Sequence, residues 1–428
     1  MSPLATFFQP FSLAARSTPI SLSHQGLTNT RSNKRYSQEQ MLAFLVLPFL
    51  FFHDWPQLLG PNRNGIYTDS DVAWPSAFAW EREVGAGFSA PVIASGKVIL
   101  FHRKGKSEIV EAFEAATGKT VWTFEYPTNY KDDFGFDNGP RSAPTVSGST
   151  VFTFGAEGVL HAIDLNTGSK IWRVDVHKDF QVEKGFFGAG CSPLIHDGKL
   201  FLNIGSKKAG VGAFDPATGK LIWKATSHEA SYSSPAAANF GVVFFTREGI
   251  VVTDKDSGKV IYEKHWRARA HASANAASPI VDGNLLFITS NYAVGAIVVD
   301  FSTTPPTELW SGDDAISAHY ATPVLIDGFL YGLHGPTQTG QQLRAVELKT
   351  GKVAWKMLTG QGGGSVTLIK DYLMYLRDDG QLFKVKPNPE KLEVLANFKI
   401  MDGKIRAFPA IGNGLVCIRN STLLECLR

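Results

Sequence analysis

Cysteine is scarce in this chain of 428 residues, in which Cys191, Cys417 and Cys426 are the only three. Three cysteines are too few for a disulfide scaffold, and no C-x-x-C spacing that would hold a metal is present, so we predict no metal site. We interpret all three as buried free thiols that act as small apolar side chains. A pairing of Cys417 with Cys426 across a C-terminal hairpin is the alternative.

Outside the N-terminal region the chain has no net charge. Four of the 42 basic residues and one of the 39 acidic residues lie within residues 1–40, which leaves 38 of each in the remainder. Non-specific nucleic-acid binding requires a basic surface, and a neutral body does not offer one. We therefore expect no nucleic-acid partner.

No apolar run is long enough to span a membrane. Residues 41–52, MLAFLVLPFLFF, are an uninterrupted apolar run of 12, whereas a membrane-spanning helix needs about 20. The run suits the apolar core of a signal peptide, with Arg31, Lys34 and Arg35 as its positive region. We therefore expect no integral membrane segment, and export to the periplasm or the extracellular space.

The segment before this run leaves two other interpretations open. Its first 38 residues contain no Asp or Glu and are rich in Ser and Thr, as organelle transit peptides are. Translation starting near Met41 is the third interpretation. In each case we predict residues 1–53 to be a disordered extension with a signal-like segment, and residues 54–428 to be a single domain.

Helical periodicity is absent as well, and short repeated units take its place. A small residue followed by Pro and apolar residues recurs at spacings of about 42 to 53 residues, the length of a four-stranded propeller blade. The clear copies start at Ser89, Ser142, Ser192, Ser234, Ser278 and Thr322, and weaker copies at Ser365 and Phe408.

Each unit also contains three turn signals and an aromatic residue in a fixed order. Turns such as Asp197-Gly198 and Asp327-Gly328 require a positive φ, which Gly and Asp tolerate. The third turn usually ends in Thr-Gly, and shortly after it an aromatic residue opens the fourth strand. The tryptophans at this place are Trp80, Trp122, Trp172, Trp223, Trp310 and Trp355.

This arrangement resembles the pyrroloquinoline-quinone-like (PQQ-like) repeat, whose signature is A-x-D-x-x-T-G-x-x-x-W. Residues 162–172 and 213–223 fit the signature closely. Residues 55–65, 130–141 and 311–322 are similar to segments of bacterial exported PQQ-like propeller proteins. The resemblance implies a β-propeller in which each of the six tryptophans docks on the neighbouring blade.

Counting the units predicts an all-β protein, an eight-bladed β-propeller of four-stranded antiparallel blades. The C-terminal unit supplies only three strands, at residues 408–411, 415–419 and 423–427. The missing strand lies at the other end of the domain, because residues 78–84 have the Trp and the strand pattern without strands before them. An N-terminal strand therefore closes the last blade and removes the free sheet edges.

In a propeller, the loops that join each fourth strand to the next first strand gather around one mouth of the central channel. Two of these loops are long, since Trp122 to Ser142 and Trp172 to Ser192 each span 20 residues, and long loops on a rigid scaffold often carry binding sites. We predict a ligand site where polar residues converge at this mouth. The candidates are Asp137, Arg141, Tyr232, Asn275, His319, Tyr320 and Arg406.

The two arginines suit a carboxylate ligand, and His319 could act as an acid or a base. The alternative is that these residues link blades by hydrogen bonds and ion pairs. We favour a monomeric, non-catalytic scaffold that binds a protein or a glycan and needs no cofactor. The alternative function is a PQQ- and calcium-dependent quinoprotein dehydrogenase that oxidises an alcohol or a sugar. Alcohol-oxidising members of the family carry two adjacent cysteines, and none are adjacent here.

Overall fold

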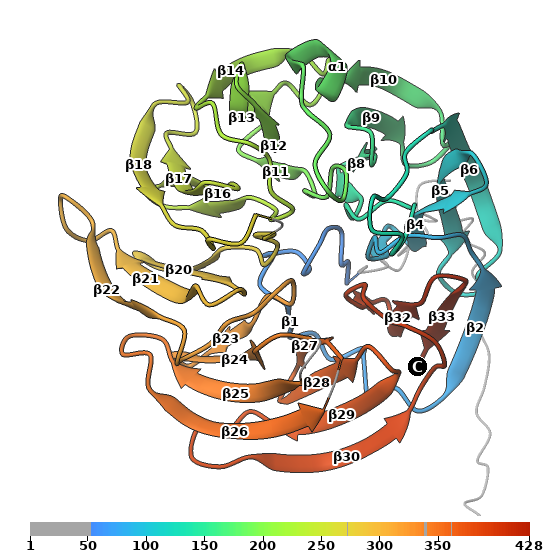
Figure 1. Ribbon diagram of the computed structural model, residues 1–428. Helices are drawn as coiled ribbons and strands as arrows, with labels where there is room; N and C mark the ends of the chain where they lie inside the picture. The colour runs from blue at the N-terminus through green and yellow to red at the C-terminus, as the bar shows by residue number, and fades with distance from the viewer. Residues whose placement is uncertain (1–52, 272, 338–339, 361) are drawn as a thin grey trace, which may run out of the picture. The chain divides into compact units, whose positions relative to one another are not determined.

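Antiparallel sheets follow one another around a ring in the computed structural model, which describes residues 53–428 apart from 272, 338–339 and 361 (Figure 1). Within these residues there are eight sheets, seven with four strands and one with five. The predicted extension, residues 1–53, lies almost entirely outside the described residues. In the described part of the chain, no helix is long and apolar enough to cross a membrane.

The first four blades each contain four consecutive strands. Blade one contains β3 (Val92–Ala94), β4 (Lys97–Lys104), β5 (Ser107–Glu114) and β6 (Thr120–Pro127). Blade two contains β7 (Thr145–Ser147), β8 (Thr150–Phe154), β9 (Val159–Asp164) and β10 (Lys170–Asp175), after which comes the short helix α1 (Val176–Phe180). Blade three contains β11 (Leu194–His196), β12 (Lys199–Ser206), β13 (Ala209–Phe214) and β14 (Leu221–Ala225). Blade four contains β15 (Ala236–Ala238), β16 (Gly241–Phe245), β17 (Gly249–Thr253) and β18 (Val260–His265).

The last four blades include both strands from the N-terminal part of the domain. Blade five contains β19 (Ile280–Asp282), β20 (Leu285–Ser290), β21 (Gly295–Asp300) and β22 (Thr307–Gly312). Blade six contains β23 (Val324–Ile326), β24 (Phe329–His334), β25 (Gln341–Glu347) and β26 (Val353–Gly360). Blade seven contains β27 (Gly364–Ile369), β28 (Tyr372–Arg377), β29 (Gln381–Lys386), β30 (Glu393–Lys399) and β1 (Ile66–Tyr67). Blade eight contains β31 (Ala410–Gly412), β32 (Leu415–Arg419), β33 (Leu423–Leu427) and β2 (Phe78–Glu83).

The two ends of the domain meet in blade eight, as predicted. Strand β2 pairs antiparallel with β33, and Trp80 lies opposite Cys426 in the register. Figure 1 shows the blue β2 beside the dark red β33. The predicted eight-bladed propeller, with its last blade closed by an N-terminal strand, is therefore confirmed.

The Asp and Thr of the repeat signature build the third turn of each regular blade. In blade two, the carboxylate of Asp164 accepts hydrogen bonds from the backbone N–H of Asn166 at 3.0 Å and of Thr167 at 2.8 Å. It also accepts one from the Thr167 hydroxyl at 2.9 Å. These local bonds stabilise a turn in preference to a continued strand, so the chain reverses at this point.

The indoles of the repeat connect six of the eight blades to the blade that follows. The six tryptophans each donate an Nε1–H bond of 2.7–3.1 Å to a carbonyl in the third turn of the following blade. In five of these turns the indole lies against the glycine; at Gly168, for example, a Cβ would come within 2.8 Å of the Trp122 ring. The Gly of the signature is therefore required by close approach as well as by its φ of 73°.

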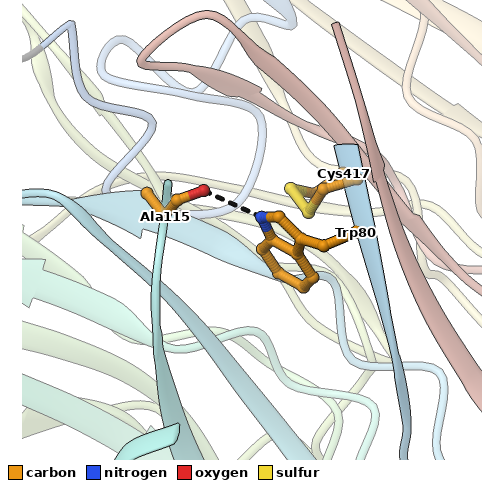
Figure 2. The surroundings of a disulfide bond; sticks show 4 residues. Trp80, Ala115 and Cys417 are labelled. Atoms are coloured by element: carbon orange, nitrogen blue, oxygen red, sulfur yellow. Dashed lines mark hydrogen bonds between the residues drawn. A yellow bond between two sulfur atoms is a disulfide. The ribbon is translucent and has the colours of Figure 1, made fainter. Parts of the chain in front are cut away.

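Two of the three cysteines form a disulfide. Cys417 and Cys426 lie directly opposite each other on β32 and β33, and their sulfurs are bonded. The interpretation as free thiols is therefore wrong for this pair, because the register places the two side chains on the same face of the sheet. Cys191 is a buried free cysteine. Figure 2 shows Trp80 beside the disulfide, with its indole N–H directed to the Ala115 carbonyl.

An element that the sequence did not predict lies inside the ring. Strand β1 pairs in parallel with β27, the inner strand of blade seven, in the register Ile66 opposite Leu368 and Tyr67 opposite Ile369. Figure 1 shows β1 near the centre of the ring. We call residues 53–67, which end in this strand, the channel segment.

The channel segment contacts the inner parts of several blades. The backbones of Trp55 and Ile93 exchange two hydrogen bonds of 2.8 and 2.9 Å, which tie the segment to blade one. The guanidinium of Arg63 donates to the carbonyls of Pro193 at 2.9 Å and Ser192 at 3.2 Å, at the start of blade three. Blades three and seven are opposite each other in a ring of eight, so the chain from Arg63 to Ile66 crosses the channel.

Candidate functional site

A pocket of about 240 Å³ opens among the loops that join the outer strand of each blade to the inner strand of the next. We call this end of the ring the loop face. The two long loops each contribute a phenylalanine to the lining, Phe136 and Phe187. Five of the seven candidate residues line the pocket: Arg141, Tyr232, His319, Tyr320 and Arg406.

The channel segment contributes to the wall of this pocket. Leu58 is the one member of the segment in the described lining. It packs on a cluster made by its buried neighbour Leu59 with Ala90, Ala143 and Phe408. The segment therefore adds an apolar side chain to the pocket, which its sequence did not predict.

Arg141 is already neutralised by a carboxylate. Its Nη2 lies 2.9 Å from Oδ2 of Asp132, whose side chain is fully buried. The same guanidinium lies over the rings of Phe88 at 5.6 Å and Phe187 at 5.4 Å. Asp132 also accepts from the backbone N–H of Phe134 at 2.9 Å, so this ion pair organises the first long loop.

Arg406 is held differently. Its guanidinium lies over Phe88 at 5.1 Å and over Phe136 at 5.4 Å. Its Nε is buried without a hydrogen-bond partner, and no ion pair within residues 53–428 as described includes it. Arg406 therefore gives the pocket its unneutralised positive charge.

His319 and its tyrosine neighbours form one wall of the pocket. His319 Nε2 lies 3.0 Å from the Tyr292 hydroxyl. Burial, and then the charge of Arg406, lowers the pKa of His319 to about 4. Burial raises the pKa of Tyr320, whose hydroxyl is buried without a hydrogen-bond partner among the described residues. A general base works best with a pKa near the working pH, so His319 is not poised for that role at neutral pH.

The remaining two candidates lie outside the pocket lining. Asp137 accepts from the backbone N–H of Gly139 at 2.6 Å and shapes the first long loop. Asn275 is 3% exposed and donates to the Thr246 carbonyl at 2.8 Å, while its Oδ1 accepts from the Ser290 hydroxyl. Both side chains are used by local structure and do not point to the residues with which they were expected to converge.

The repeated Ser-Pro elements connect blades around the base of the pocket. The hydroxyl of Ser192 accepts from the Ala143 N–H at 2.8 Å, and that of Ser234 accepts from the Ser192 N–H at 2.9 Å. Thr322 accepts in the same way from the Ser278 N–H at 2.9 Å. A small hydroxyl residue recurs at this position because it satisfies a backbone donor of the preceding blade.

The sequence profile of a family described as outer membrane protein assembly factor BamB matches residues 106–357, more than half of the chain. The chain belongs to this family. This BamB-like family, with its PQQ-like repeats, is the one that the turn motif and the tryptophans predicted. The match runs from β5 of blade one into β26 of blade six.

Individual relatives of the chain have two kinds of description. BamB of Yersinia pestis is 23% identical over 261 residues, covering 57% of this chain and 61% of that protein. The dehydrogenase subunit of a quinone alcohol dehydrogenase from Gluconobacter oxydans is 32% identical over 143 residues, covering 31% of this chain and 18% of that protein. Each match thus covers less than two thirds of the relative. The crystal structure of BamB from Moraxella catarrhalis superposes with a TM-score of 0.58 at 15% identity, covering 82% of this chain and 98% of that one.

The PQQ and calcium that the alternative dehydrogenase function would need do not fit the lining of this pocket. Calcium is held by six to eight oxygen ligands, most often from carboxylates, and the described lining contains no Asp or Glu. No group of three His, Cys, Asp or Glu within the described ranges could hold a metal ion. PQQ carries three carboxylates, whereas Arg406 alone offers an unneutralised charge. We therefore propose no catalytic step that uses PQQ.

Proposed function

We propose that this chain is an exported, non-catalytic member of the BamB-like family that holds a protein partner on its loop face. The relatives described as assembly factors support a scaffold function. The lining of the pocket supports it too, because His319 is not poised as a base and no described carboxylate reaches the pocket. The disulfide between Cys417 and Cys426 supports export, since disulfides persist in oxidising compartments.

The observation that carries the proposal is a cluster of phenylalanines on the two long loops, in which the two from the first loop are exposed and the two from the second are half-buried. Phe134 is 49% exposed and Phe136 is 57% exposed, and their rings stack at 6.1 Å. Phe187 from the second long loop lies 5.2 Å from Phe134, and Phe186 lies 5.9 Å from it. We call these four residues the aromatic cluster. Exposed aromatic side chains beside a pocket are typical anchors of protein interfaces.

A protein partner fits this face better than a glycan. A buried sugar needs acceptors as well as donors for its hydroxyl groups, because each unpaired hydroxyl costs about 1–3 kcal/mol. The described lining contains no carboxylate or side-chain amide. An apolar side chain of a protein requires no such partners and would bury the aromatic cluster.

Site-specific photocrosslinking tests the proposal. A photoreactive amino acid replaces Phe134 in the full chain, and in a matched control it replaces Leu395, which is also 49% exposed but lies on the outer strand β30. We expect a discrete crosslinked protein in the periplasmic fraction from position 134 and none from position 395. Phe134→Ser with Phe186→Ser should also abolish co-purification of that protein, while Leu395→Ser should not.

Two outcomes would contradict the proposal. Equal crosslinking from positions 134 and 395 would mean that the aromatic cluster is not the interface. Addition of PQQ and Ca²⁺ gives a second arm, because the quinone absorbance would appear on the protein if it were a quinoprotein. Dye-linked oxidation of an alcohol after that addition would replace the scaffold function with the dehydrogenase function.

A further inference from the structure

The polar groups of the pocket are strongly biased towards hydrogen-bond donors. The hydroxyl oxygens of Ser192, Ser234 and Thr322 each accept from a backbone N–H of the preceding blade. None of the described residues accepts the protons of these three hydroxyls. Each hydroxyl can therefore still donate to a ligand.

The side chains higher in the pocket have the same bias. Arg406 has only donors, and its Nε is buried without a partner in the described structure. The Tyr320 hydroxyl is buried and donates to no described residue, and burial raises its pKa. Both side chains belong to the pocket lining, so a ligand that supplies acceptor oxygens would be complementary to it.

The charges of the lining residues indicate a ligand with one negative charge. Arg141 is compensated by Asp132, and His319, with its pKa of about 4, is neutral at pH 7. Arg406 remains as the one cation without a counter-charge in the described lining. A ligand with one carboxylate balances this charge, whereas a second carboxylate would have no cation to pair with.

The walls and the size of the pocket define the rest of the ligand. Phe88, Phe136, Phe187 and Tyr232 contribute aromatic rings to the lining, and Leu58 contributes an aliphatic side chain. The volume of about 240 Å³ is smaller than that of pockets for drug-sized ligands, which begin at about 300 Å³. The space therefore suits one large apolar side group.

We propose that this pocket binds a monocarboxylate that carries a single large apolar side group. A free carboxylic acid and the C-terminal residue of a polypeptide share this chemistry. The polypeptide source rests on the proposed function, because the aromatic cluster at the mouth would hold the residues that precede such a C-terminus. A polypeptide would continue from the pocket over the aromatic cluster, whereas a free acid would not. The experiment below separates these two sources.

Isothermal titration of the full chain with matched probes tests the inference. The small probes are 3-phenylpropionate and its neutral amide. The peptide probes are a hexapeptide ending in phenylalanine with a free C-terminus and the same peptide with an amidated C-terminus. We expect both carboxylates to bind and both amides to bind at least about tenfold more weakly, because a charge-assisted hydrogen bond is lost.

Substitutions of Arg406 locate the site. Arg406→Met should weaken binding of both carboxylates by about tenfold or more, and Arg406→Lys should restore part of it because the charge remains. Arg173→Met is the matched control, since Arg173 forms an ion pair with Asp175 on β10, the outer strand of blade two, away from the pocket lining. If Arg406→Met fails to fold, the comparison of acid with amide on the unmodified chain still tests whether the pocket requires a carboxylate.

Each result supports or overturns the inference. Equal binding of acid and amide, no binding of either acid, or unchanged binding to Arg406→Met would overturn it. Tighter binding of the free-ended peptide than of 3-phenylpropionate assigns the polypeptide source, and the reverse order assigns a small acid. Failure here, with crosslinking at Phe134 intact, would leave the proposed function standing. Carboxylate binding without any crosslink from position 134 would support this inference and contradict the proposed function.

Discussion

The indole of Trp122 lies directly on the backbone of Gly168, so closely that a Cβ there would come within 2.8 Å of the ring. Gly168→Ala should therefore separate blade one from blade two and destabilise the protein. Gly198→Ala is the matched control, because Gly198 has a φ of 71° against 73° for Gly168 and open space where its Cβ would lie. We expect Gly168→Ala to cost about 1–3 kcal/mol more than the control in urea unfolding. Equal costs would show that backbone strain alone makes glycine necessary.

The disulfide should stabilise the blade that closes the ring. Cys417 and Cys426 are nine residues apart, and closing a loop of this length is worth about 2–3 kcal/mol in the chain-entropy description. We expect Cys417→Ser with Cys426→Ser to lower the melting temperature and to make it insensitive to dithiothreitol. The wild-type chain, in contrast, should lose stability in reductant. A wild-type melting temperature that does not change on reduction would contradict the prediction.

Removing the Arg63 side chain should loosen the channel segment. Arg63 is buried, and its guanidinium donates to the carbonyls of Ser192 and Pro193, so Arg63→Ala leaves both without this donor. We expect a loss of about 2–4 kcal/mol and faster hydrogen exchange in residues 53–67. Arg173→Ala, which removes an exposed ion pair, should cost less than about 1 kcal/mol. Unchanged exchange in residues 53–67 would show that β1 and the Trp55–Ile93 hydrogen bonds hold the segment without Arg63.

Acid should destabilise the fold through buried histidines. Burial, and then the charges of Arg173 and Lys170, lowers the pKa of His161 to about 3, against 6.5 for an ordinary histidine. The unfolded chain therefore takes up a proton between pH 7.5 and 5 while the folded chain does not, so stability falls as the pH falls. One such group contributes about 2 kcal/mol over this range. The same direction holds for His177 and His334, whose pKa values are lowered to about 4.

His161→Phe isolates this contribution. The His161 ring packs against Tyr126 at 4.3 Å and Phe124 at 5.2 Å, and its Nδ1 is buried without a hydrogen-bond partner in the described structure. Phenylalanine fits these neighbours and does not titrate. We expect the drop in melting temperature between pH 7.5 and 5 to be smaller in the variant. An equal drop would mean that other groups control the acid response.

Local signals explain why the fold was predictable from the sequence. The bonds that Asp164 makes to Thr167 span three residues, so the turn motif alone fixes the chain reversal wherever it recurs. The count of blades and the pairing of β2 with β33 then follow from the number of repeats and from the strand that is missing. The channel segment left no such signal, because the partners of Ile66 and Tyr67 lie about 300 residues away.

The site was predictable only in part. Positions before the Ser-Pro elements predicted a site at the channel mouth, and five of the seven residues chosen in this way line one pocket: Arg141, Tyr232, His319, Tyr320 and Arg406. Sequence position does not tell which way a side chain points, so Asn275, which is buried in hydrogen bonds, could not be separated from them. The pairing of Arg141 with Asp132 also depends on the folded shape of a loop. The sequence therefore could not show that, of the two arginines, Arg141 has an ion pair and Arg406 has none in the described structure.

The place of β2 beside β33 has a consequence for how the molecule is made. Residues 78–83 are synthesised before blades one to seven, whereas their partner, residues 423–427, is synthesised after them. In a growing chain β2 therefore remains without its partner while those seven blades are made, and an unpaired strand favours aggregation. A nascent chain cut short by only a few residues would stay an open arc rather than a ring.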